Sequence, residues 1–281
     1  MGQLLGVELF KTRKRMMVWI LLAVLVGFMI LDLVFSYLAV TSISGHRDAA
    51  SIESLRIALQ FPKAFTLVLA GTQGIGIILL IILAASLTGS EYGWATVTQT
   101  IGRKGTRSLY IGSKLISLII VALILVLIGL AVGTALSAFN TYKLAGQINW
   151  DFFTLSFAGS LIKMFIWTAF TIMIYALLAV LFATVGRSVV AGIGGALGYY
   201  FIESILVAVL TNSTGWTHRI PDYLIGHNIG ALLRTGVERN GPFSSSNTVP
   251  SGLHATLILT IYAVVFLGTI LYVFKRQDLN A

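Results

Sequence analysis

The chain has 281 residues, of which 57% are hydrophobic and only 10% are charged, with a formal net charge of +9. Soluble domains carry about a quarter of charged residues, so a soluble fold with this composition would have too little polar surface to cover its core. The absence of cysteine excludes disulfides, thiolate metal sites and cysteine nucleophiles. Basic residues beside apolar segments usually set orientation and bind anionic lipid, so we expect membrane lipid as a partner and no nucleic acid.

Six continuous apolar stretches divide the chain, each near or above the ~20 residues that a helix needs to cross the hydrocarbon core. They are 17–41, 64–89, 109–138, 157–184, 189–211 and 255–274. The runs are continuous, whereas a transmembrane β-barrel would show alternating apolar and polar residues. We therefore predict a single transmembrane domain over 1–281, an all-α, multi-pass protein of the cell (cytoplasmic) membrane.

Lysine and arginine predict the orientation of these spans, because basic residues concentrate in short cytoplasmic loops. With the N-terminus inside, the cytoplasmic segments hold eleven basic residues, and the much longer outer loops hold seven. Both termini are therefore expected in the cytoplasm.

Two elements are predicted before the second span. Residues 1–15 favour a short interfacial helix, in which Leu4, Leu5 and Phe10 face lipid while Lys11 and Lys14 meet headgroups. A frayed tail with stop-transfer charges is the alternative. Residues 42–63 are predicted to form an outer loop with a short surface helix that ends at Pro62.

The segment between the second and third spans, residues 90–108, is the strongest functional candidate. Glu91 lies where the second span leaves the membrane, and it is placed to cap a helix N-terminus. Tyr92 and Trp94 suit the headgroup level. Residues 95–101 favour a helix along the membrane, which Gly102 ends before a basic run. An ordinary positive-inside loop with an aromatic anchor is the alternative.

Three ionisable residues lie inside predicted spans: Asp32, Lys163 and Glu203. Such residues are costly in lipid and face a partner or a cavity. All three are expected at similar depths below the outer surface, so we predict that Lys163 pairs with Asp32 or Glu203. A polar export route is the alternative role. Glycine clusters in spans two, three and five predict close helix packing, and span five could line a contact with a second membrane subunit.

The loop over residues 212–254 is predicted to hold one or two short helices that dip into the outer interface. Pro221 is placed to open a helix. The four histidines all fall in predicted outer segments, without the spacing of a metal site. The sequence also lacks the short motifs of zinc proteases and serine hydrolases, so no catalytic residue and no metal site is predicted.

Several short motifs resemble those of one family. They are a Leu-Leu-x-x-Glu-Leu-x-Lys start (Leu4 to Lys11), Glu91-Tyr92-x-Trp94-Ala95-Thr96 after the second span, a basic Gly105-Thr106-Arg107, a Gly112-x-Lys114 in the third, and a Phe274-Lys275-Arg276 tail. In order and spacing the chain resembles permease subunits of ATP-binding-cassette transporters of the second, exporter-like type. Ala95 departs from a position where this family often has glycine.

The resemblance implies that residues 90–108 form a coupling helix on a separate cytoplasmic ATPase subunit. The implied ATPase contacts are Glu91, Tyr92, Trp94, Thr96, Arg103, Lys104, Arg107 and, from a second turn, Arg187. The chain would act as a dimer with itself or a second permease, and it would export a substrate that the sequence does not identify. ATP and magnesium would bind to the partner, with no cofactor bound directly, and the chain itself would not be an enzyme.

The sequence is consistent with nucleotide binding by a separate subunit. A nucleotide-binding cassette needs Gly-x-x-x-x-Gly-Lys-Ser/Thr, and the glycines at 102 and 105 do not provide it. Two other classes stay open. One is an ion-coupled secondary transporter that uses Asp32 and Glu203, although no proline breaks any span. The other is a membrane scaffold or sensor subunit that transports nothing.

Overall fold

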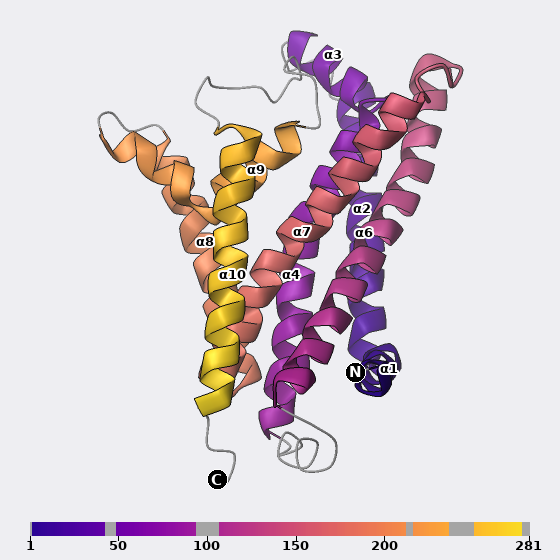
Figure 1. Cartoon of the computed structure of the whole chain (residues 1–281). Helices are drawn as coiled ribbons and strands as arrows, with labels where there is room; N and C mark the ends of the chain where they lie inside the picture. The colour runs from indigo at the N-terminus through magenta and orange to yellow at the C-terminus, as the bar shows by residue number, and fades with distance from the viewer. Residues whose placement is uncertain (1, 43–48, 94–106, 212–215, 236–249, 277–281) are drawn as a thin grey trace.

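The structure is a computed structural model that describes residues 2–42, 49–93, 107–211, 216–235 and 250–276. Within these ranges the regular elements are helices (Figure 1). They are α1 (Gly2–Lys14), α2 (Met16–Ser42), α3 (Ala49–Ala58), α4 (Ala64–Gly93), α6 (Arg107–Ala145), α7 (Leu155–Val185), α8 (Val189–Leu210), the 3₁₀ helix η1 (Trp216–Tyr223), α9 (Ile225–Thr235) and α10 (Gly252–Arg276).

Six of the described helices, namely α2, α4, α6, α7, α8 and α10, are long and apolar enough to cross a membrane, as predicted. The third is longer than its predicted span, because α6 continues to Ala145. At 1.5 Å per residue its 39 residues extend about 58 Å, well beyond a hydrocarbon core of about 30 Å. Part of α6 must therefore project from the membrane or tilt.

The helices run alternately up and down, so the chain segments sort to two ends of the bundle (Figure 1). The α1 end holds α1, the end of α4, the start of α6, the α7–α8 turn and the end of α10. The α9 end holds α3, η1 and α9. Both described chain termini thus lie at one end, as the six-span reading predicts, and the side of the membrane that each end faces stays a prediction.

The short elements agree with the sequence in type but differ in detail. The helix predicted before Pro62 is α3, which ends at Ala58. Pro221 does not open a helix as predicted, because it lies inside η1. The helix opens instead at Ile225, and its buried side carries Ile229 and Leu232.

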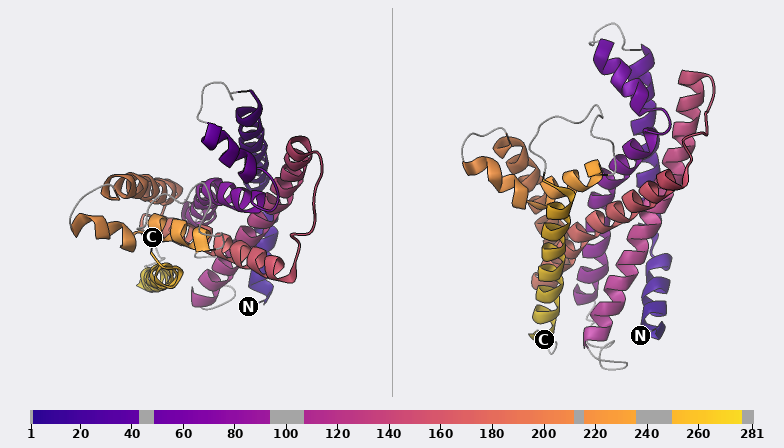
Figure 2. Two further views of the ribbon diagram at one scale, coloured as in Figure 1. Left: turned by 90° about the horizontal axis from the view of Figure 1, so that it is seen from above. Right: turned by 45° about the horizontal axis from the view of Figure 1, so that its top comes forward.

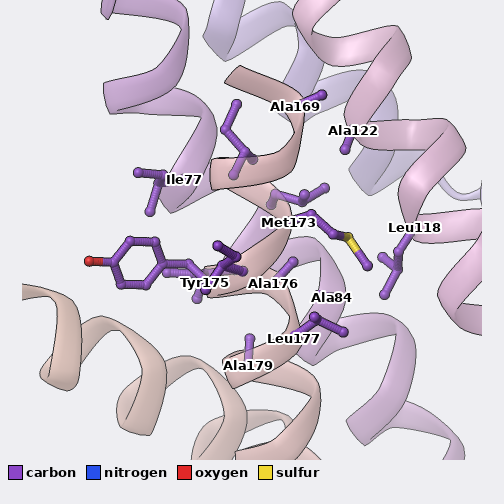
Figure 3. Packing of buried hydrophobic residues seen from close by; sticks show 14 of the residues in the cluster. Ile77, Ala84, Leu118, Ala122, Ala169, Met173, Tyr175, Ala176, Leu177 and Ala179 are labelled. Carbon is purple, nitrogen blue, oxygen red and sulfur yellow. The ribbon is translucent and has the colours of Figure 1, made fainter. Parts of the chain in front are cut away.

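The centre of the bundle is α4, which packs most extensively on α7 and also contacts α2, α6 and α8. Small residues such as Ala84 and Ala176 let α4, α6 and α7 approach closely in the core (Figure 3). In that view Met173 points toward Leu118 on α6, and Tyr175 points the opposite way. Side chains two residues apart on a helix point to nearly opposite sides, so α7 contacts neighbouring helices on both of these sides.

Glycine packing is confirmed where α8 leaves the α7 turn. A Cβ added at Gly192 would lie 2.7 Å from the Ala85 Cβ and 2.8 Å from the Ala183 Cβ. Farther along the same helix, a Cβ at Gly194 or Gly198 would meet nothing within 4 Å. Helices α7 and α8 diverge from their shared turn, as two views show (Figures 1 and 2). Tight packing of α8 is therefore concentrated at the α1 end.

A pair of alanine substitutions on α8 tests this packing. Gly192→Ala should lower the free energy of unfolding by about 1–3 kcal/mol, because its methyl group would overlap Ala85 and Ala183. Gly194→Ala is the matched control, and it should be neutral or stabilising by up to about 1 kcal/mol, since alanine is the better helix former. Unfolding in mixed micelles measures both. Equal effects of the two substitutions would contradict the packing described.

Candidate functional site

A buried ion pair lies at the α1 end of the bundle. Glu91, in the last turn of α4, bonds Lys114 of α6 through its Oε2 atom. The two side chains are only 7% and 4% exposed. A buried charge is tolerated when it is paired and hydrogen-bonded. This pair therefore fixes the end of the second span against the start of the third.

Lys114 and Glu91 each have further bonds. The Lys114 Nζ atom also donates to the Leu87 carbonyl at 3.1 Å, one turn before Glu91 on α4. The Tyr110 hydroxyl donates to the same Glu91 Oε2. The Tyr110 ring stacks on Phe274 of α10, with ring centroids 5.8 Å apart. One carboxylate thus links α4 to α6 directly and to α10 through an aromatic contact.

The N-terminal helix α1 binds to the same carboxylate. Lys11 Nζ lies 3.6 Å from Glu91 Oε1 and 3.1 Å from Glu8 Oε1. Arg15, at the joint of α1 and α2, donates to the Ser90 hydroxyl at 3.1 Å and the Ser86 carbonyl at 3.4 Å. Residues Gly2–Lys14 are helical, and the position of this helix at the membrane interface stays a prediction. Lys11 contacts Glu8 and Glu91, whereas the sequence predicted that it would meet headgroups.

We call Glu8, Lys11, Arg15, Glu91, Tyr110 and Lys114 the Glu91 cluster. It gathers three cations and two carboxylates around the C-terminal end of α4. The C-terminus of a helix carries a partial negative charge, which basic side chains stabilise. The excess of positive charge in the cluster therefore suits the partial negative charge at the end of α4. Glu91 itself lies at a helix C-terminus, whereas the sequence predicted that it would cap an N-terminus.

A small pocket adjoins the cluster. Its wall is formed by α4, α6, α7 and α10, through Thr88, Glu91, Tyr92, Tyr110, Ile111, Lys114, Leu115, Val180, Thr184 and Phe274. The Thr88 hydroxyl is buried and has no hydrogen-bond partner within the described part of the chain. A bridging water would satisfy such a group. The pocket is too small to suggest a substrate site, and a movement of any of the four helices would change its shape.

Only some of the predicted ATPase contacts lie within the described residues. Glu91 and Tyr92 line the pocket just described. Arg107 begins α6. The other contacts from the 90–108 segment, which are Trp94, Thr96, Arg103 and Lys104, lie outside the described residues, as does the helix predicted over 95–101.

Arg187 lies in the turn that joins α7 to α8, at the same end of the bundle. Its backbone φ is 47°, a left-handed conformation that non-glycine residues seldom adopt. Ser188 follows and caps α8, because its hydroxyl accepts a bond from the Ala191 N–H at 3.0 Å. The turn is therefore tight, and Arg187 is exposed at the end of the bundle where α4 ends and α6 begins. Strained residues of this kind often mark functional positions.

The predicted pairing of Lys163 with a carboxylate is wrong. Glu203 on α8 accepts a bond from the Tyr175 hydroxyl at 2.6 Å and from the Gly226 N–H at 2.8 Å. It thereby caps the N-terminus of α9, where a carboxylate is favoured. Lys163 and Asp32 are exposed, and neither forms an ion pair among the described residues. Equal depth in the membrane did not imply that the side chains face one another.

Sequence reasoning named Glu8, Lys114 and Phe274 only as parts of motifs and Lys11 also as a headgroup contact, and it did not bring them together. One signal was available, since each residue is a polar or aromatic group at the predicted cytoplasmic edge of an apolar span. Tyr110 was missed entirely. It lies four residues before Lys114, the spacing of neighbours on one helix face.

The fold and this site define a helical bundle with six candidate membrane spans and a charged cluster that joins α1, α4 and α6 at one end. The model of a family described as a protein of unknown function, DUF2705, matches residues 20–280, so the chain belongs to that family. A comparison with curated proteins finds no match.

A double-mutant cycle tests the buried pair. Glu91→Leu or Lys114→Met alone should each lower the free energy of unfolding by about 3 kcal/mol, because each removes the closest partner of the buried charge that remains. The double variant should recover most of that loss. Lys11→Met is the control, with an expected change below about 1 kcal/mol, since Lys11 is 38% exposed. Additive single effects would show that the pair is not coupled.

Proposed function

We propose that the chain is the membrane permease subunit of an ATP-binding-cassette transporter of the exporter-like type. It works as a homodimer or heterodimer of permeases in the cell membrane. A separate cytoplasmic ATPase subunit supplies the energy by binding ATP and magnesium and hydrolysing the nucleotide. The chain contributes the path through the membrane and the surface that receives the ATPase.

The observation that supports this proposal is the convergence of separated motifs. Glu8 and Lys11 come from the N-terminal motif, Glu91 from the end of the second span, Lys114 from the third and Phe274 from the tail. These residues meet in or beside the Glu91 cluster. Four of the five motifs on which the resemblance rests are thus connected by contacts, as expected of parts that serve one function.

The cluster also supplies a mechanical route. The 90–108 segment begins at the last turn of α4 and ends in the first turn of α6. A force on it would act on Glu91 and Lys114 together, and through them on α1 and α10. An ATPase shifts the equilibrium between inward- and outward-facing states only by binding them differently. Because a buried ion pair joins α4 and α6 at the two ends of the segment, a movement of the segment would displace both helices together.

The ion-coupled alternative is weakened by the position of Glu203. That alternative needs two carboxylates that accept and release ions or protons. Glu203 is buried, its two oxygens accept bonds from Tyr175 and Gly226, and it holds α9 in place. A group that caps a helix is poorly suited to cycle between bound and free states.

The proposed orientation can be tested by labelling single cysteines, because the natural chain has none. A membrane-impermeant maleimide added to intact cells should label Ser245→Cys in the outer loop. It should label Thr106→Cys only after the cells are permeabilised. The opposite pattern would place the 90–108 segment outside, and no cytoplasmic ATPase would reach it.

ATPase docking can be tested by charge reversal in the 90–108 segment. Replacement of Arg103, Lys104 and Arg107 with glutamate should reduce co-purification of a candidate ATPase from a neighbouring reading frame by about tenfold. The reason is that like charges across an interface cost several kcal/mol. Membrane insertion should be unchanged.

The matched control reverses three basic residues at the α9 end, which are Lys63, Lys143 and Arg219. This variant carries the same change in net charge and should keep the ATPase bound. Undiminished co-purification by the first variant, or equal loss by both, would overturn the docking role of the segment.

A further inference from the structure

Asp32 is a carboxylate on an apolar, exposed side of α2. It lies ten residues before the α2 end at Ser42, which is about 15 Å along the helix. A charged group at such a depth in a bilayer is costly unless it meets a partner, water or a ligand. No cation of the described residues lies within ion-pair distance of Asp32. The described chain therefore supplies no cationic partner for this carboxylate.

The surroundings of Asp32 are aromatic along its own helix. Phe28 precedes it by four residues and Phe35 follows it by three, so the three side chains share one side of α2. The two phenylalanines are 45% and 65% exposed. A carboxylate between two exposed rings offers an organic cation both an ion pair and cation–π contacts.

The neighbouring helix leaves room beside this carboxylate. A Cβ built on Gly71 of α4 would lie 3.6 Å from Asp32 Oδ2, so Asp32 borders α4 at a residue without a side chain. Three residues on, a Cβ at Gly74 would meet nothing within 4 Å, and Ala70 is also exposed. The outer half of α4 is open here, whereas its half near the Glu91 cluster is almost fully buried.

We infer that this face is the binding site for an amphipathic organic cation. We call it the Asp32 face, and it consists of Phe28, Asp32, Phe35, Ala70, Gly71 and Gly74. The carboxylate pairs with the positive group, the two rings contact its apolar substituents, and the glycines leave space for its bulk. The inference names a substrate class for the proposed transporter, and in that sense it rests on the proposed function.

A second copy of the chain fits the Asp32 face less well as an occupant. A two-fold contact centred on this face would bring two Asp32 carboxylates together in an apolar setting, where like charges repel strongly. A cation neutralises the carboxylate instead. The charge of Asp32 therefore favours a cationic ligand over a direct contact between copies.

The test measures ligand binding to the purified chain alone, in nanodiscs of zwitterionic lipid. Tetraphenylphosphonium is the probe, and tetraphenylborate has the same shape with the opposite charge. Empty nanodiscs give the background from partition into lipid. We expect saturable binding of the phosphonium above this background, and at least about tenfold weaker binding by Asp32→Asn, since loss of one partner of a charge pair that the bound ligand shields from water costs at least that much.

Three further variants sharpen the result. Asp32→Glu keeps the charge and should keep phosphonium binding, and Phe35→Leu should weaken it a few-fold by removing a ring. Lys163→Gln removes an exposed charge from α7 and should change nothing. Tetraphenylborate binding should not fall in Asp32→Asn.

Three outcomes would overturn the inference. The first is wild-type binding no greater than that of empty nanodiscs, and the second is equal phosphonium binding by wild type and Asp32→Asn. The third is a change of oligomeric state in Asp32→Asn with phosphonium binding unaltered, which would assign the face to a second copy. No ATPase is present in this test, so its failure is separable from a failure of ATPase docking.

Discussion

A bilayer does not solvate charge, and this constraint explains the arrangement of the few ionisable groups in the bundle. Glu91 and Lys114 are buried together and neutralise one another. Glu203 forms no ion pair with a cation of the described residues, and it is stabilised instead by a phenol and by the N-terminus of α9. Glu91, Lys114 and Glu203 each find their partners on another helix, whereas Glu8 pairs with Lys11 within α1. The polar contacts therefore decide which helices stay together.

Helix α7 connects the two buried carboxylates. Tyr175 reaches Glu203 on one side, and Thr184 lines the pocket beside Glu91 nine residues later, about 14 Å along the helix. The middle of α7 is buried on nearly all sides by α4 and its neighbours. A helix held this tightly moves as one rod, because packed cores are not continuously deformable. A displacement at the Glu91 cluster would therefore be transmitted along α7 toward Glu203.

The helices could be predicted from the sequence, and the pairing of their side chains could not. Continuous apolar runs identified all six spans, since length and hydropathy are local properties. The pairing of Lys163 with a carboxylate was wrong, because depth in the membrane fixes only one of three coordinates. The rotation of each helix about its axis decides which neighbour a side chain faces. Glu203, for example, faces Tyr175 on α7. Lys114 was visible as a motif residue, but only the approach of α4 to α6 identifies Glu91 as its partner.

The attachment of α1 also has a consequence for biosynthesis. Lys11 finds its partner Glu91 eighty residues later in the chain, and Arg15 finds Ser90 seventy-five residues later. At the usual pace of a ribosome, on the order of 5–20 residues per second, that delay lasts several seconds. Throughout this interval the newly synthesised α1 lacks its contacts with Glu91 and Ser90, so we expect it to lie at the membrane surface. Its exposed Phe10 and its flanking basic residues suit a temporary stay among the headgroups, before the growing bundle captures it.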